Sequence, residues 1–256
     1  MATYTIKETA PIVIAFAKAN IRRPLLSVLP YVLICGMITA ITDKTHPYIG
    51  IAAQLMTFYF SSLYASNVHR SFLHGTPTTG LDPFRPSKDD WRFMGMVFLV
   101  FLIVALIGAV SGFLGAMAHS KSILITAILL SCIIAVWMSL RISLVFPDRA
   151  VGGHMKMRES FALTRGLVGK MLLTPFAASW ILLLASIGWL IVAGLIDVFI
   201  IQKIFPAFAT KEISPSHKLV LYVLMSPVTV GMSFWYSTVC VATLSNYYLW
   251  VKENRA

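Results

Sequence analysis

Residues 91–147 decide the fold class, and they read WRFMGMVFLVFLIVALIGAVSGFLGAMAHSKSILITAILLSCIIAVWMSLRISLVFP. Charged side chains occur in this stretch only at Arg92, Lys121 and Arg141. A helix needs about 20 mostly apolar residues to cross a hydrocarbon core of about 30 Å. The stretch is long enough for two such helices, and Ser120–Lys121 marks a turn between them. We therefore predict a transmembrane hairpin here.

The rest of the chain is also rich in apolar residues and poor in charged ones. It has 256 residues, of which 58% are hydrophobic and only 12% charged, and its mean hydropathy is +0.80. A soluble domain is about 45–50% apolar and roughly a quarter charged. The three cysteines, Cys35, Cys132 and Cys240, all lie in apolar runs and form no CxxC pair. These features exclude a soluble enzyme, a disordered chain and a disulfide scaffold, and they predict an all-α polytopic membrane protein.

Six segments are long and apolar enough to be transmembrane helices within a single domain, 1–256. They are residues 25–42, 48–66, 91–119, 122–147, 171–201 and 219–251. Two further helices are expected to lie on the inner leaflet, at residues 10–23 and 154–170. In the first, Thr9 is a possible cap and Lys18 lies near the end; in the second, Met157 and Phe161 begin an apolar stripe. Pro227 and Gly231 predict a kink in the last span, as helices that line transporter sites have.

The longest polar stretch, residues 67–90, contains several glycines and prolines and is predicted to form turns. Lys88, Asp89, Asp90 and Arg92 follow each other closely at the start of the third span. We interpret this mixed-charge group as a solvated face.

The distribution of basic residues predicts the orientation. Sixteen of the 21 Lys and Arg residues fall on the side that carries both termini, and five fall on the other. Because cytoplasmic loops carry the excess of Lys and Arg, we expect both termini to be cytoplasmic. The net charge of +11 adjoins apolar segments, so membrane surfaces and not nucleic acid are the expected partner.

No residue pattern indicates catalysis. The chain contains no HExxH, CxxC or GxxxxGK[ST] motif, so we predict no catalytic, cofactor-binding or metal site and no enzymatic activity. The run from Gly108 to Gly112 has one residue too many for the GxSG serine motif. Gly108, Gly112 and Ala116 instead repeat every four residues, a spacing that favours close helix packing.

Asp197 is the single carboxylate inside a predicted span, and such an acid is a candidate polar site by default. It lies about 39 Å along the helix from Met171 at 1.5 Å per residue, more than the roughly 30 Å core. Two interpretations stay open: an acid near the outer headgroups, or a buried partner or proton-carrying group.

Basic residues cluster before and within the predicted second interfacial helix. The candidate contacts for anionic lipid are Arg141, Arg149, Lys156, Arg158 and Arg165. Guanidinium groups bind phosphate through paired hydrogen bonds, so these residues could seat an anionic headgroup; they could equally serve only to set the topology. Arg141 is expected to reach the cytoplasmic interface and to pair with Asp148 or with a lipid phosphate.

The run Arg141-Ile-Ser-Leu-Val-Phe-Pro147, followed by Glu159-Ser-Phe-Ala-Leu-Thr-Arg-Gly166, resembles the YciC-like family of bacterial inner-membrane proteins. It is also similar to the membrane domain attached to some glycerophosphodiester phosphodiesterases. The match covers about 30 residues, and the catalytic domain of those enzymes has no counterpart here. The resemblance implies an integral cytoplasmic-membrane protein with a role in the envelope and no hydrolase activity.

These observations favour a non-enzymatic, envelope-associated six-span protein whose basic interfacial helices contact anionic phospholipid. A transporter or permease subunit for a small molecule is the alternative, suggested by Asp197 and the Pro227–Gly231 break. A membrane-protein partner or a second copy of the chain is compatible with either function.

Overall fold

The computed structural model describes residues 5–42, 47–75, 84–117, 121–195 and 215–254. All regular structure in these ranges is helical, which confirms the all-α fold class. The helices are α1 (Ile6–Asn20), α2 (Arg22–Thr42), α3 (Pro47–His74), α4 (Lys88–Met117), α5 (Lys121–Ile142), α6 (Val145–Ala150), α7 (Met157–Leu163), α8 (Val168–Leu195) and α10 (Pro215–Asn254).

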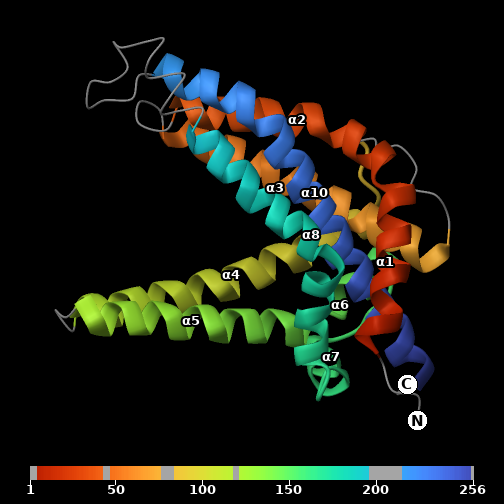
Figure 1. The fold of residues 1–256 in the computed structure, drawn as a ribbon. Helices are drawn as coiled ribbons and strands as arrows, with labels where there is room; N and C mark the ends of the chain where they lie inside the picture. The colour runs from red at the N-terminus through yellow and green to blue at the C-terminus, as the bar shows by residue number, and fades with distance from the viewer. Residues whose placement is uncertain (1–4, 43–46, 76–83, 118–120, 196–214, 255–256) are drawn as a thin grey trace.

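The helices form two arms that diverge from a common base (Figure 1). One arm is the α4–α5 hairpin, and the other is a bundle of α2, α3, α8 and α10. The base contains α1, α6, α7 and the C-terminal end of α10, and both chain termini lie on this side.

Four helical stretches are long and apolar enough to cross a membrane: Arg22–Thr39, Lys88–Phe113, Leu124–Ile142 and Val228–Asn254. A fifth is α8 if its two parts, Val168–Ile181 and Leu183–Trp189, count as one span with a bend of 56°. The described helices therefore support four or five membrane spans. The predicted span 48–66 forms part of α3, which is not among them.

The α4–α5 arm exposes apolar side chains around most of its circumference. Only 11% of the stretch Leu124–Ile142 is buried within the protein, and Phe113 and Ile133 are each about two-thirds exposed. Exposed apolar area of this extent is unstable in water but suits a hydrocarbon environment. The arm has the surface of a lipid-embedded hairpin.

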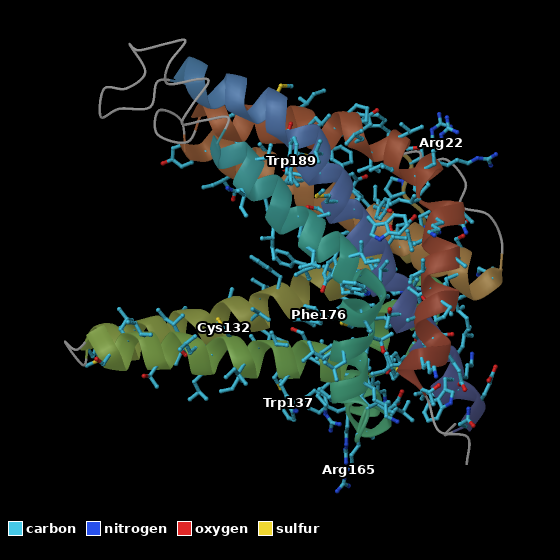
Figure 2. All side chains as sticks on the ribbon, viewed as in Figure 1. Arg22, Cys132, Trp137, Arg165, Phe176 and Trp189 are labelled. Carbon is cyan, nitrogen blue, oxygen red and sulfur yellow. The ribbon has the colours of Figure 1, made fainter. Side chains whose placement is uncertain are left out.

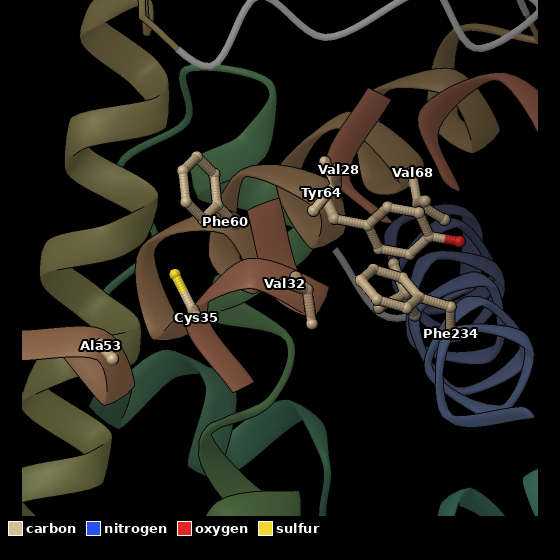
Figure 3. Close-up of a cluster of buried hydrophobic side chains, with 9 residues drawn as sticks. Val28, Val32, Cys35, Ala53, Phe60, Tyr64, Val68 and Phe234 are labelled. Atoms are coloured by element: carbon tan, nitrogen blue, oxygen red, sulfur yellow. The ribbon is translucent and has the colours of Figure 1, made fainter. Parts of the chain in front are cut away.

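The core of the other arm lies where α2, α3 and α10 meet (Figure 3). Val28 and Val32 of α2 pack with Phe60 and Tyr64 of α3 and with Phe234 of α10. The Tyr64 and Phe234 rings meet edge to face, with their centroids 4.6 Å apart. The Tyr64 hydroxyl hydrogen-bonds the side chain of Thr238, so the largest buried side chain of this core also has its polar atom satisfied.

Helix α1 covers most of the predicted helix 10–23 but ends at Asn20, and Arg22 and Arg23 belong to α2 instead. The buried stripe of α1 packs on protein. Thr9, Val13 and Ala17 recur every four residues and are buried. Val13 and Ala17 pack with Val239 and Ala242 of α10. The residues left for a membrane surface are those on the opposite face of the helix.

The structure divides the helix predicted over residues 154–170. Helix α7 spans only Met157–Leu163, and α8 begins at Val168. Between them Gly166 has φ +77°, a left-handed conformation that ends a helix and suits glycine. The predicted fourth span is also shorter than expected, because α5 ends at Ile142 and a separate helix begins at Val145.

Candidate functional site

The short helix α6 is the centre of the base. Its Val145, Pro147 and Ala150, with the preceding Leu144, are buried. Helix α6 packs against α3, α4 and α10, so it joins the two arms. A six-residue helix is too short to be stable alone; its position depends on this burial and on one acidic side chain.

That side chain is Asp148, which is 8% exposed. Its carboxylate accepts a hydrogen bond from the Tyr248 hydroxyl at 2.9 Å and one from the backbone N–H of Met155 at 2.7 Å. Asp148 therefore ties α6 to α10 and to the loop that leads into α7. These bonds, and not a pair with Arg141, satisfy its charge.

A second buried acid, Asp90, fixes the start of α4. Its carboxylate accepts hydrogen bonds from the backbone N–H and the hydroxyl of Ser87, at 2.9 and 2.7 Å. The Ser87 hydroxyl in turn accepts from the Asp90 N–H at 3.2 Å, which completes a capping box. The other carboxylate oxygen accepts from Ser66 at 2.7 Å and forms an ion pair with Arg70. The solvated face expected around Asp90 is thus a buried link between α3 and α4.

His69 is a further buried polar group at the base, beyond the end of the predicted span 48–66. It is 1% exposed, its Nδ1 lies 2.7 Å from the Ser245 hydroxyl, and its ring centroid lies 5.7 Å from that of Phe93. Burial lowers the pKa of His69 from 6.5 to about 3, because desolvation disfavours the charged imidazolium. His69 is therefore neutral and structural at physiological pH.

Arg141 occupies the last turn of α5, where a cation is favoured by the helix dipole. Its guanidinium carbon lies 4.9 Å from the ring centroid of Phe161 and 5.7 Å from that of Trp137. The Nε atom is enclosed and has no hydrogen-bond partner. Among the described residues, the ion pairs are Arg70–Asp90 and Arg92–Asp89, so Arg141 has no carboxylate.

Helix α7 is docked on the end of α5 by two hydroxyls. The side chains of Ser160 and Thr164 donate to the backbone carbonyl of Arg141, at 2.8 and 3.2 Å. The last carbonyls of a helix have no partner within it, so these bonds satisfy the C-terminus of α5. They also bring Phe161 against the Arg141 side chain.

Two other predicted lipid contacts flank Phe161 in sequence. Arg158 lies three residues before it in α7, a spacing that places the two side chains on one helical face, and Arg165 follows in the turn after α7. Both are exposed, and Arg165 points away from the molecule (Figure 2). Arg141, Arg158, Trp137 and Phe161 are called the arginine–aromatic site below.

The remaining two basic candidates lie outside this arrangement. Arg149 turns toward its own loop and donates to the carbonyl of Gly153 at 3.0 Å and to that of Met155 at 3.4 Å. Lys156 is exposed, and its backbone N–H donates to the Glu159 carboxylate at 3.1 Å. Among the predicted basic candidates, Arg149 therefore holds its own loop, whereas Lys156, Arg158 and Arg165 are exposed.

The predicted packing glycines face open space within this chain. A Cβ atom added at Gly108 or Gly112 meets nothing within 4 Å, so contact of that face with another chain stays a prediction. The side chain of Ala116 and the whole of Asp197 lie outside the described residues. The described residues contain no group of three or more His, Cys, Asp or Glu side chains that could hold a metal ion.

Sequence reasoning missed the structural roles of Asp90, Asp148 and His69. The Ser87-x-x-Asp90 spacing is a readable capping-box signal and could have identified the start of α4. The other two have no local signal, because their partners, Tyr248 and Ser245, lie 100 and 176 residues away.

Comparison with known proteins gives no relative: no protein family, no curated protein and no solved structure matches this chain. The resemblance of residues 141–166 to the YciC-like family therefore stays a prediction.

Proposed function

We propose that this chain is a non-enzymatic integral protein of the bacterial inner membrane, and that the arginine–aromatic site holds the phosphate of an anionic phospholipid. Both termini and the base would face the cytoplasm. The observation that carries this proposal is Arg141, a guanidinium placed on two aromatic faces with an enclosed Nε and no acidic partner.

An arginine in this setting favours a phosphate ligand. Cation–π contacts stabilise the charge by only about 0.5–2 kcal/mol and leave the planar N–H donors of the guanidinium unused. A phosphate accepts two of them at once. Asp148, the acid closest in sequence, is already engaged by Tyr248 and Met155, so a lipid phosphate is the remaining partner expected from the sequence.

The position of the site agrees with a lipid headgroup. Arg141 ends a span that is apolar from Leu124 onward, and Trp137 lies one turn earlier, where indole rings favour the membrane interface. The exposed Arg158 adds a second cation near Phe161. Basic residues beside an anionic leaflet contribute about 1 kcal/mol each.

A transporter or permease subunit remains the second candidate, favoured by the bend of 56° in α8. Broken helices line substrate sites in many transporters. The open face at Gly108 and Gly112 would admit a helix of a partner protein or of a second copy. The absence of a solute-uptake defect on deletion would count against this function.

Removing the two cations of the arginine–aromatic site is expected to release anionic lipid. We expect Arg141→Gln with Arg158→Gln to lower the retention of phosphatidylglycerol about ten- to thirty-fold relative to wild type, since two contacts of about 1 kcal/mol are lost. Retention is measured by native mass spectrometry after purification from vesicles of phosphatidylglycerol and phosphatidylcholine. Phosphatidylcholine retention should be unchanged.

The matched control is Arg22→Gln with Arg23→Gln, which removes the same charge from two exposed arginines at the start of α2. Retention close to wild type in this control, together with loss in the first variant, supports the arginine–aromatic site. Equal loss in both variants would show a general effect of positive charge and would contradict the proposal, as would no loss in either.

A further inference from the structure

A pocket of about 350 Å³ lies between α8 and α10 in the bundle arm, far from the arginine–aromatic site. Leu183, Ser186 and Trp189 of α8 line one side, and Thr229, Met232 and Tyr236 of α10 line the other. Figure 2 shows Trp189 in the bundle arm, well away from Trp137 at the base of the hairpin arm. The volume is within the range of small-molecule sites, about 300–1,000 Å³.

The described lining of this pocket selects an uncharged ligand. It contains no charged side chain, and placing an unpaired ion among such groups would be costly. Leu183 and Met232 offer apolar surface. An aliphatic chain is therefore the expected apolar part of the ligand.

The hydrogen-bonding groups of the pocket then select the polar part of the ligand. Ser233 already donates to the Thr229 carbonyl at 2.9 Å, and Ser186 donates to the Met232 sulfur at 3.3 Å. The indole Nε1 of Trp189 is enclosed and has no partner. A buried donor without an acceptor costs about 1–3 kcal/mol, so a ligand oxygen beside this ring would relieve that cost.

The depth of the pocket identifies where such an oxygen is found in a membrane. Trp189 lies about 32 Å from Val168 along the path of α8 at 1.5 Å per residue, close to the thickness of the hydrocarbon core. Because α8 bends by 56° between Ile181 and Leu183, this path is longer than the depth that Trp189 reaches; with the start of α8 at the base, Trp189 lies in the leaflet opposite the base. The ester carbonyls of that leaflet are the acceptors next to its acyl chains.

We infer that the α8–α10 pocket binds one acyl chain of a membrane glycerolipid and that Trp189 donates a hydrogen bond to its ester carbonyl. The lipid comes from the leaflet opposite the base. The bend in α8 between Ile181 and Leu183 lies at one end of the pocket lining, where α8 changes direction. This site recognises an ester and a chain, whereas the arginine–aromatic site recognises a phosphate.

The test compares two phosphatidylcholines with equal chains, one ester-linked and one ether-linked, because the ether lipid lacks the carbonyl. Detergent-solubilised protein is mixed with equal amounts of both, and retained lipid is counted by native mass spectrometry. We expect wild type to retain the ester lipid about five-fold more than the ether lipid. Trp189→Phe, which removes only the N–H and part of the ring, should retain both equally.

Trp180→Phe is the matched control, because Trp180 lies on the same helix and is 59% exposed; it should keep the wild-type preference. Ser186→Phe, which fills the pocket, should retain less of both lipids. Equal retention of the two lipids by wild type would overturn the inference, and so would a preference that persists in Trp189→Phe. Methyl laurate supplies a free ester; if it binds while neither phospholipid is retained, the occupant is not a membrane lipid and the inference is wrong. Both phospholipids carry no net charge, so a negative result in this test does not contradict the proposal for the arginine–aromatic site.

Discussion

Replacing Asp90 with alanine is expected to lower the free energy of unfolding by about 3 kcal/mol, because it breaks a partly buried ion pair and removes the capping box of α4. Asp90 is 5% exposed. Its loss leaves Arg70 without its acid, Ser66 without its acceptor and α4 without its capping box. The measurement is an unfolding titration with sodium dodecyl sulfate from a mild detergent, followed by tryptophan fluorescence.

Asp89→Ala is the matched control for this prediction. Asp89 pairs with Arg92 at 3.2 Å, but both side chains are more than a third exposed. Exposed pairs contribute less than about 1 kcal/mol, so this neighbouring substitution should be mild. If the two variants lose similar stability, Asp90 does not anchor α4 to α3.

The second large effect is expected at Gly153. A Cβ atom there would lie 2.3 Å from both carboxylate oxygens of Asp148, closer than non-bonded atoms approach. The carboxylate cannot turn away without losing its bonds to Tyr248 and to the Met155 N–H. We expect Gly153→Ala to cost about 3 kcal/mol from overpacking and lost charged hydrogen bonds, measured by the same titration.

A double-mutant cycle identifies the cause of that loss. Asp148→Ala alone should also destabilise, but Gly153→Ala should add little in its presence, because the clash has gone. Additive losses would mean that the carboxylate is not what excludes a side chain at Gly153. Gly169→Ala, where an added Cβ meets nothing within 4 Å in α8, should be neutral or slightly stabilising.

These substitutions all address the base, because that is where the two arms are joined. Asp90 connects α3 to α4, and Asp148 connects α6 to α10. Away from the base, the α4–α5 arm is stabilised mainly by the packing of α4 on α5 and by the hydrocarbon around it. The packing of α6 and a few polar contacts therefore hold the arms together at the base, and two lipid sites are proposed at opposite membrane levels.

The apolar helices could be predicted closely from the sequence. The expected range 25–42 corresponds to α2, Arg22–Thr42, and 219–251 lies within α10, Pro215–Asn254. A run of apolar residues has few alternatives to a helix when water is absent, so composition alone suffices. The hairpin of residues 91–147 was predicted for the same reason.

Predictions from hydropathy were wrong where polar residues form hydrogen bonds or ion pairs with partners far away in the sequence. Residues 67–74 were expected to form turns, yet they continue α3 to His74, because His69 and Arg70 find partners on α10 and α4. The stripe over residues 154–170 suggested one helix, but periodicity does not register the left-handed glycine at Gly166. In the candidate site, the arginines could be predicted from sequence; the placement of Phe161 on Arg141 required the docking of α7.

The account depends most on the claim that the α4–α5 arm lies in hydrocarbon, and Cys132 tests it directly. Cys132 is exposed near the middle of α5; Cys35 and Cys240 are first replaced by alanine. In nanodiscs, a water-soluble maleimide should leave Cys132 unmodified while it modifies Lys252→Cys, an exposed position at the base, in a variant in which Cys132 is also replaced by alanine. Modification of Cys132 as fast as that of the base cysteine would contradict the account.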